Sequence, residues 1–115
     1  MKQAKAITKF VRISPSKARL AAGLIRGLSV EDALTQLHFS NLKGGRLLLK
    51  TLNSAIANAE TQHDARRENL KVQEVRVDEG PTLKRAKSRN KGGVVPIMKR
   101  TSHFTIVLSI EGQGE

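Results

Sequence analysis

The chain has 115 residues, with 21 lysines and arginines against 10 aspartates and glutamates, and its formal net charge is +11. This length supports one domain, because chains usually divide only beyond roughly 200 residues, and the absence of cysteine excludes a disulfide scaffold and any thiolate metal site. No apolar run approaches the roughly 20 residues of a membrane span, and no signal-peptide core follows the first charges. We therefore expect a soluble cytoplasmic protein that has no membrane partner. Its high positive charge indicates that it binds a polyanion.

The first part of the chain predicts a strand followed by a helix. Residues 4–13 are rich in β-branched side chains and alternate loosely, as is typical of a strand. Ser14 and Pro15 form a helix start, with serine as N-cap and proline at the first helical position, and Gly27 suits the helix end. The apolar residues that we expect on the buried side of this helix are Ala18, Leu20, Ala21, Ala22, Leu24, Ile25 and Leu28.

Two further helices are expected in the next 35 residues or so. A short second helix should follow Ser29 and direct Ala33, Leu34 and Leu37 to the core. The third helix, from about Asn41 to Gln62, should be the longest, although Gly44 and Gly45 weaken its first turn by roughly 1 kcal/mol each relative to alanine. Its expected buried stripe is Leu48, Leu52, Ala55, Ile56 and Ala59, and the small residues Ala55, Ala57 and Ala59 favour close packing.

The second half of the chain reads as β structure. Residues 70–77 alternate between apolar and polar, but the alternation slips by one residue after Val72, which predicts a β-bulge near Gln73 and Glu74. Residues 103–110 alternate without a slip and predict a second strand.

Residues 81–101, between these two strands, predict a long projecting hairpin. Their strongest turn signal is Asn90-Lys91-Gly92-Gly93, and folding the chain there brings 84–85 close to 99–100 and Val77 close to Ile106. Each arm of about ten residues would project roughly 33 Å from a body roughly 30 Å across. A disordered basic loop is the alternative, because an isolated two-stranded ribbon is marginal in water.

Together these elements define an α+β fold, with three helices packed on a small antiparallel sheet and a long projecting β-hairpin. We expect one domain, residues 1–115, made of a globular body (1–80 and 102–115) and an extended hairpin (81–101).

The excess positive charge is concentrated in two blocks. Residues 1–28 and 81–101 each hold seven basic residues and no acidic residue, whereas acids and bases are mixed between the blocks. A solvated charged face would account for one such block, but two of them indicate a surface that contacts phosphates. The expected contacts are Lys5, Lys9, Arg12, Lys17, Arg19 and Arg26 in the first block and Lys84, Arg85, Lys87, Arg89, Lys91, Lys99 and Arg100 in the second.

Catalysis has little support in the sequence. His38, His63 and His103 are scattered, and none belongs to a metal-binding or nucleophile motif. The glycines form neither a Walker loop nor a dinucleotide fingerprint. We therefore predict no enzyme activity, no metal and no cofactor.

The kind of nucleic-acid binding can be narrowed from the aromatic residues. The chain has three of them, Phe10, Phe39 and Phe104, and two occupy expected core positions. Readers of single strands stack bases on aromatic rings, so we expect phosphate and ribose contacts to a folded RNA that is recognised by its shape.

Four motifs resemble one known family over nearly the whole chain and in the same order. The chain is similar to large-subunit ribosomal protein twenty-two in residues 14–27 (Ser-Pro-Ser-Lys-Ala-Arg-Leu to Leu-Ile-Arg-Gly), 54–60 (Ser-Ala-Ile-Ala-Asn-Ala-Glu), 77–85 (Val-Asp-Glu-Gly-Pro-Thr-Leu-Lys-Arg) and 99–105 (Lys-Arg-Thr-Ser-His-Phe-Thr).

This resemblance implies a ribosomal protein that binds 23S ribosomal RNA and lies beside neighbouring large-subunit proteins. It implies that the hairpin runs along the wall of the nascent-peptide exit tunnel, with the tip, Asn90, Lys91, Gly92 and Gly93, near the nascent peptide. Carried over by motif, Lys17, Arg19 and Arg26 would be body contacts to the RNA, and Lys84, Arg85, Lys99 and Arg100 contacts along the hairpin stem.

Two other function classes remain open from the residues alone. One is a general basic RNA- or DNA-binding chaperone, which would gain nothing from a single ribbon of fixed length. The other is a small enzyme acting on an acidic substrate, for which the chain offers no candidate acid, base or nucleophile.

Overall fold

The computed structural model describes residues 2–88 and 94–111. For residues 84–88 and 94–97 it describes the backbone but not the side chains. The elements in chain order are β1 (Lys2–Val11), α1 (Pro15–Ile25), α2 (Val30–His38), α3 (Lys43–His63), the 3₁₀ turn η1 (Arg67–Asn69), β2 (Leu70–Glu79), β3 (Leu83–Ser88), β4 (Val94–Lys99) and β5 (Ser102–Ile110). Three of the strands form an antiparallel sheet in the order β1-β5-β2, and β3 pairs with β4.

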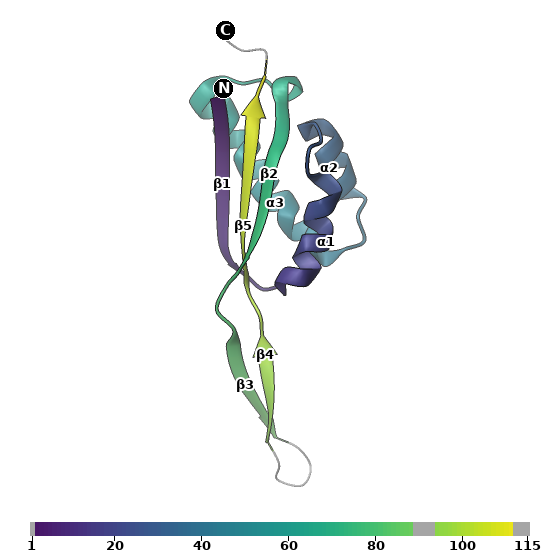
Figure 1. Cartoon of the computed structure of the whole chain (residues 1–115), viewed down its shortest axis with the longest axis vertical. Helices are drawn as coiled ribbons and strands as arrows, with labels where there is room; N and C mark the ends of the chain where they lie inside the picture. Colours follow the sequence, from purple (N-terminus) through teal and green to yellow (C-terminus); the bar gives the residue numbers. More distant parts are fainter. Residues whose placement is uncertain (1, 89–93, 112–115) are drawn as a thin grey trace.

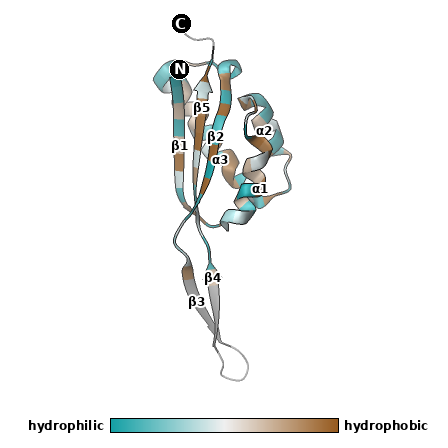
Figure 2. Cartoon of the chain, in the orientation of Figure 1, coloured by the Kyte–Doolittle hydropathy of each residue, from teal (hydrophilic) through white to brown (hydrophobic). Residues whose placement is uncertain are grey.

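The helices cover one face of the three-stranded sheet. In Figure 1 α3 lies behind the sheet, and α1 and α2 lie beside β2. Apolar and polar residues alternate along β1 and β2 (Figure 2), whereas the central strand β5 is buried along most of its length. Phe104, Ile106 and Leu108 of β5 are fully buried and form the middle of the core. The expected α+β architecture is confirmed.

Helix α1 begins where the sequence predicts, with Ser14 in an extended conformation and Pro15 as its first residue. Four small or branched residues, Ala18, Ala21, Ala22 and Ile25, are fully buried. The expectation that Leu20 and Leu24 share this buried side is wrong, because they are 65% and 41% exposed. At about 100° per residue, both lie about 100° or more around the helix from the stripe that Ala18 and Ile25 define.

Helix α3 approaches α1 closely at Gly44. A Cβ on this glycine would lie 3.2 Å from the Cα of Ala18 and 3.3 Å from the Cβ of Ala21. Gly44 and Gly45 are buried, so the glycines that weaken the first turn of α3 also permit its contact with α1. The five residues of the expected α3 stripe are buried, but Ala57 is exposed and takes no part in the packing.

We expect a larger side chain at Gly44 to destabilise the protein. Gly44→Leu should lower the free energy of unfolding by about 1–3 kcal/mol or more, because the added atoms meet the backbone of Ala18. Gly23→Ala on α1 is the matched control, since nothing lies within 4 Å of a Cβ there, and it should stabilise the helix by up to about 1 kcal/mol. Urea unfolding of the two variants measures both effects. A Gly44→Leu variant that is as stable as Gly23→Ala would contradict this packing.

The predicted bulge is confirmed, since the register between β2 and β5 shifts between Val72 and Glu74. The expected pairing of Val77 with Ile106 is wrong by two residues, because Val77 pairs with Phe104. In β3–β4 Leu83 pairs with Lys99, so the three residues 80–82 on one arm face only two residues, 100 and 101, on the other. The extra residue on the first arm accounts for part of the two-residue difference between the expected and the observed partner of Val77.

The hairpin projects from the body as the sequence predicts (Figure 1). The chain measures 68 × 24 × 17 Å along its principal axes, and the β3–β4 pairing runs from Leu83↔Lys99 to Ser88↔Val94. The predicted turn, residues 90–93, lies outside the described residues. Within the described part of the chain, no helix has the length and apolar character needed to cross a membrane.

Candidate nucleic-acid interface

A basic cavity of about 310 Å³ opens where the hairpin leaves the body. We call it the root pocket. Three segments that are far apart in the sequence line it: the turn between β1 and α1 with the first turn of α1, the first residue of α3, and the end of β4 with the residue that follows. Its lining residues are Arg12, Ile13, Ser14, Lys17, Lys43, Met98, Lys99 and Arg100.

The root pocket has two walls, one formed by residues 12–14, 17 and 43 of the body and the other by residues 98–100 of the hairpin. Hydrogen bonds fix these walls relative to each other. The Ser102 hydroxyl donates to the carbonyl oxygen of Ile13 at 2.7 Å, which joins β5 to the turn before α1. At the hairpin base, the N–H of Gly80 donates to the carbonyl of Thr101 at 3.0 Å, and the Thr101 hydroxyl donates to the carbonyl of Pro81 at 2.6 Å. A Cβ on Gly80 would collide with this hydroxyl, so glycine is required there.

The root pocket gathers positive charge without local neutralisation. Five of its eight lining residues are lysine or arginine and none is acidic, and the ion pairs found among residues 2–88 and 94–111 include none of these five cations. The Ser14 hydroxyl is buried there and has no hydrogen-bond partner within the described structure. A bound anion would offset the repulsion among the cations.

Four residues predicted from the two charge blocks meet in this pocket: Arg12, Lys17, Lys99 and Arg100. Lys43 is a fifth cation that the block analysis missed, because it lies in a stretch where acids and bases are mixed. Its position in the first turn of the predicted longest helix, which was expected to start at about Asn41, was the available signal, since helix N-termini favour anions.

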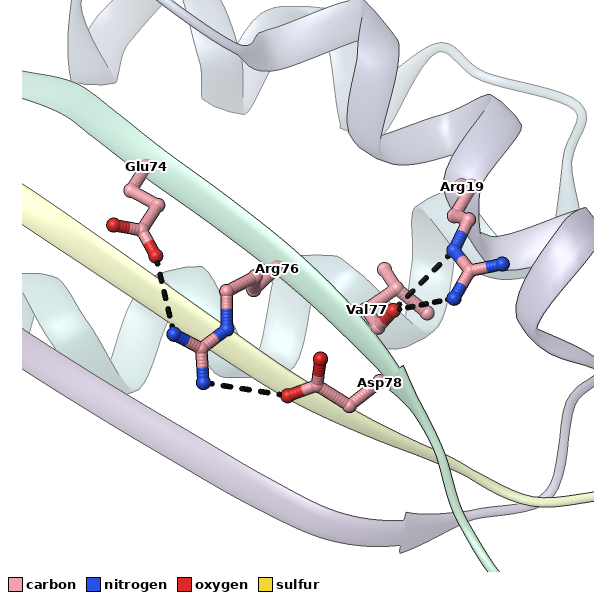
Figure 3. Close-up of polar contacts among 5 residues, drawn as sticks. All are labelled: Arg19, Glu74, Arg76, Val77 and Asp78. Atoms are coloured by element: carbon pink, nitrogen blue, oxygen red, sulfur yellow. Dashed lines mark hydrogen bonds and ion pairs between the residues drawn. The ribbon is translucent and has the colours of Figure 1, made fainter.

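Arg19 and Arg26 instead reach the outer edge of β2. Arg19 donates to the carbonyl of Val77 from Nε at 3.3 Å and from Nη2 at 3.0 Å (Figure 3), and Arg26 donates from Nη2 to the carbonyl of Val75 at 2.8 Å. Further along this edge, the backbone of Gly27 and Leu28 pairs with Val72. The two arginines therefore cover an edge strand whose carbonyls would otherwise be open, and their predicted contact with RNA stays a prediction.

Lys5 and Lys9 lie on β1 and do not line the root pocket. Lys5 lines a second cavity of about 410 Å³ on the sheet face opposite the helices, together with Glu74 and Arg76. Arg76 forms ion pairs with Glu74 at 3.6 Å and with Asp78 at 3.4 Å (Figure 3). This face has mixed charge, so its character differs from that of the root pocket.

The remaining predicted contacts belong to the hairpin. The backbone places Lys84 opposite Met98, Arg85 opposite Ile97 and Lys87 opposite Val95. The two arms meet as expected, but 84–85 pairs with 97–98 and not with 99–100, so the register differs from the prediction by two residues. The other residues predicted at or near the tip, which are Arg89, Asn90, Lys91, Gly92 and Gly93, lie outside the described residues.

The structure combines an α+β body, a projecting two-stranded ribbon and a cationic pocket at the root of that ribbon. Among the residues that the structure describes, no cluster of histidine and carboxylate side chains could hold a metal ion.

The comparisons with known proteins identify the family. The family model described as "Ribosomal protein L22p/L17e" matches residues 6–109. The large ribosomal subunit protein uL22 of Protochlamydia amoebophila is 76% identical over 109 residues, which cover 95% of this chain and 98% of the relative. The uL22 proteins of Chlamydia pneumoniae (59% over 104 residues; 90% of this chain and 94% of the relative) and Chlamydia trachomatis serovar L2 (56% over 109 residues; 95% and 98%) are also similar.

The chain belongs to the ribosomal protein L22p/L17e family, as its four sequence motifs indicate. This family consists of structural proteins without enzyme activity. Membership in this family therefore confirms the expectation that the protein is not an enzyme and excludes the small-enzyme alternative.

Proposed function

We propose that the protein is a structural constituent of the large ribosomal subunit and binds 23S ribosomal RNA through phosphate and ribose contacts. The root pocket carries this proposal, because five cations from three segments surround one cavity that holds no acidic side chain. The names of the relatives, which are large ribosomal subunit proteins, supply the subunit. Neighbouring large-subunit proteins are the further partners that follow from this location.

The geometry of the pocket suits a phosphate group of the RNA backbone. Its volume of about 310 Å³ equals that of about ten water molecules at roughly 30 Å³ each, which is enough for a partly hydrated phosphate. Arg12 and Arg100 can hold phosphate oxygens through planar guanidinium groups, whereas Lys17, Lys43 and Lys99 act as point charges. A phosphate held from both walls would tie the hairpin to the body.

The hairpin is the part that we assign to the wall of the nascent-peptide exit tunnel, with its tip near the nascent peptide. Its length supports this assignment, because the 68 Å long axis of the chain is nearly three times the next extent. A two-stranded ribbon is marginal by itself, and seven basic residues within 81–101 repel one another. Enclosure by ribosomal RNA would remove both problems at once.

Lys43, the root-pocket cation that lies outside the two charge blocks, gives the sharpest test of this proposal. Lys43→Gln should weaken the binding of 23S ribosomal RNA about tenfold and reduce the slope of log affinity against log salt by about 1, as expected when one phosphate is no longer neutralised. Filter binding across a salt series measures both quantities.

Lys71→Gln is the matched control, since this lysine is exposed on β2 and pairs with Ser109, at the end of the sheet far from the hairpin. It should leave both the affinity and the slope near the values of the parent protein. Equal decreases for the two variants would mean that total charge, and not the root pocket, determines binding.

A further inference from the structure

Phe10 has a backbone conformation that is rare for a bulky residue. Its φ is 60°, in the left-handed region, and the β1–β5 register breaks between Thr8 and Val11 around it. The N–H of Phe10 donates to Nδ1 of His103 at 3.1 Å. The two rings meet edge to face, with centroids 4.9 Å apart and an interplanar angle of 89°.

This conformation costs free energy, and burial does not offset the cost. The expectation that two of the three phenylalanines are core residues is wrong, because Phe10 is 60% and Phe39 76% exposed, and only Phe104 is buried. The other non-glycine residue of positive φ within residues 2–88 and 94–111 is Asp64, which caps the end of α3, an ordinary place for this conformation. Strain that holds an aromatic ring in solvent points to a ligand for that ring.

The surroundings of Phe10 indicate which ligand this is. Lys9 precedes the ring in an acid-free block, and Arg12, two residues later, lines the root pocket. His103 lies next to Ser102, whose hydroxyl holds the turn that carries Ser14. A flat apolar surface in a segment that also carries Lys9 and Arg12 matches the two parts of a nucleotide, which are a base and a phosphate.

We propose that Phe10 is a stacking platform for one unpaired base of the bound RNA. This inference rests on the proposed binding of ribosomal RNA and adds a base contact to the phosphate contacts. His103 is the positioning residue, because its Nδ1 accepts the Phe10 N–H and its ring supports the phenyl edge. The Phe10 ring lies in the exposed last part of β1, beyond the buried residues Ala4 and Ala6.

Three substitutions at Phe10 test the proposal with a 23S ribosomal RNA transcript as the probe. Phe10→Gly removes the ring and accepts a positive φ without strain, so its melting temperature should equal or exceed that of the parent protein. Its affinity for the transcript should fall about five- to hundredfold, which corresponds to the removal of one base stack. Phe10→Leu keeps an aliphatic cover over His103 and should show the same decrease, whereas Phe10→Tyr should bind like the parent.

The salt slope separates stacking from electrostatics, because none of these variants removes a charge and the slope should stay unchanged. Phe39→Leu, at the other exposed phenylalanine, should change neither quantity. Parent-like binding by Phe10→Gly, a weak Phe10→Tyr, or a reduced slope would overturn the base contact. Failure of the parent protein itself to bind the transcript would instead overturn the proposed function.

Discussion

The affinity of the protein for 23S ribosomal RNA is expected to fall by about 10³–10⁵ between about 50 and 200 mM monovalent salt. Such a fall follows when roughly 6–10 phosphates are neutralised and their counterions are released. The five root-pocket cations and the basic residues of the hairpin supply enough positive charge for this number of phosphates. Binding measured across a salt series, with protein stability followed in parallel, gives the slope directly.

A binding constant that is nearly flat in salt would contradict the electrostatic account. An unrelated RNA of equal length is the useful control, since it should show a similar slope but a weaker affinity at every salt concentration. Equal affinity for the two RNAs would favour the general chaperone that the sequence alone leaves open.

Removal of the hairpin should separate folding from binding. We expect a variant that lacks residues 84–100, with its arms joined by a short turn, to keep a cooperative melt and a free energy of unfolding within about 1 kcal/mol of the parent. The reason is that, among the side chains that the structure describes, the buried apolar ones lie in the body, between Ala4 and Val77 and between Phe104 and Ile110. Relief of like-charge repulsion offsets the little packing that the deletion removes.

The same variant should bind 23S ribosomal RNA far more weakly, because it lacks seven of the 21 basic residues, two of which line the root pocket. Its salt slope should fall by about 0.7–0.9 for each phosphate that is no longer neutralised. Circular dichroism and filter binding on one preparation measure both results. A deletion variant that fails to fold would show that the ribbon is part of the core, and one that binds like the parent would remove the hairpin from the interface.

Local patterns predicted most of the fold. The helix start at Pro15 and the bulge after Val72 follow from proline geometry and from strand parity, which depend on neighbouring residues alone. The exposed Leu20 and the close approach at Gly44 could not be predicted in the same way. Both depend on which helix α1 meets and how closely, and that information lies in α3, more than 20 residues away.

The candidate site was predictable in charge but not in arrangement. Counting charges found Arg12 and Lys99, but only the folded chain brings them to one cavity and adds Lys43. The count also treats Arg26 as equivalent to Lys17, although Arg26 donates to the carbonyl of Val75. Charge reversal at Arg26 would therefore disturb the edge of β2 as well as any contact with RNA, so Lys17 is the better probe of binding.

The exposure of Phe10 escaped prediction for a different reason. An apolar residue in an alternating stretch is normally assigned to the core face of a strand, and a bulge in β1 leaves no parity slip as clear as the one in residues 70–77. The partner that stabilises the bulge is His103, which is 93 residues further along the chain.

A structure of the large ribosomal subunit that contains this protein, at a resolution that shows individual phosphates, tests the central claim most directly. We predict a backbone phosphate of 23S ribosomal RNA in the root pocket, within hydrogen-bond distance of cations from both of its walls, and the hairpin enclosed by RNA. A root pocket filled by solvent or by a neighbouring protein, with the RNA backbone elsewhere, would contradict the account.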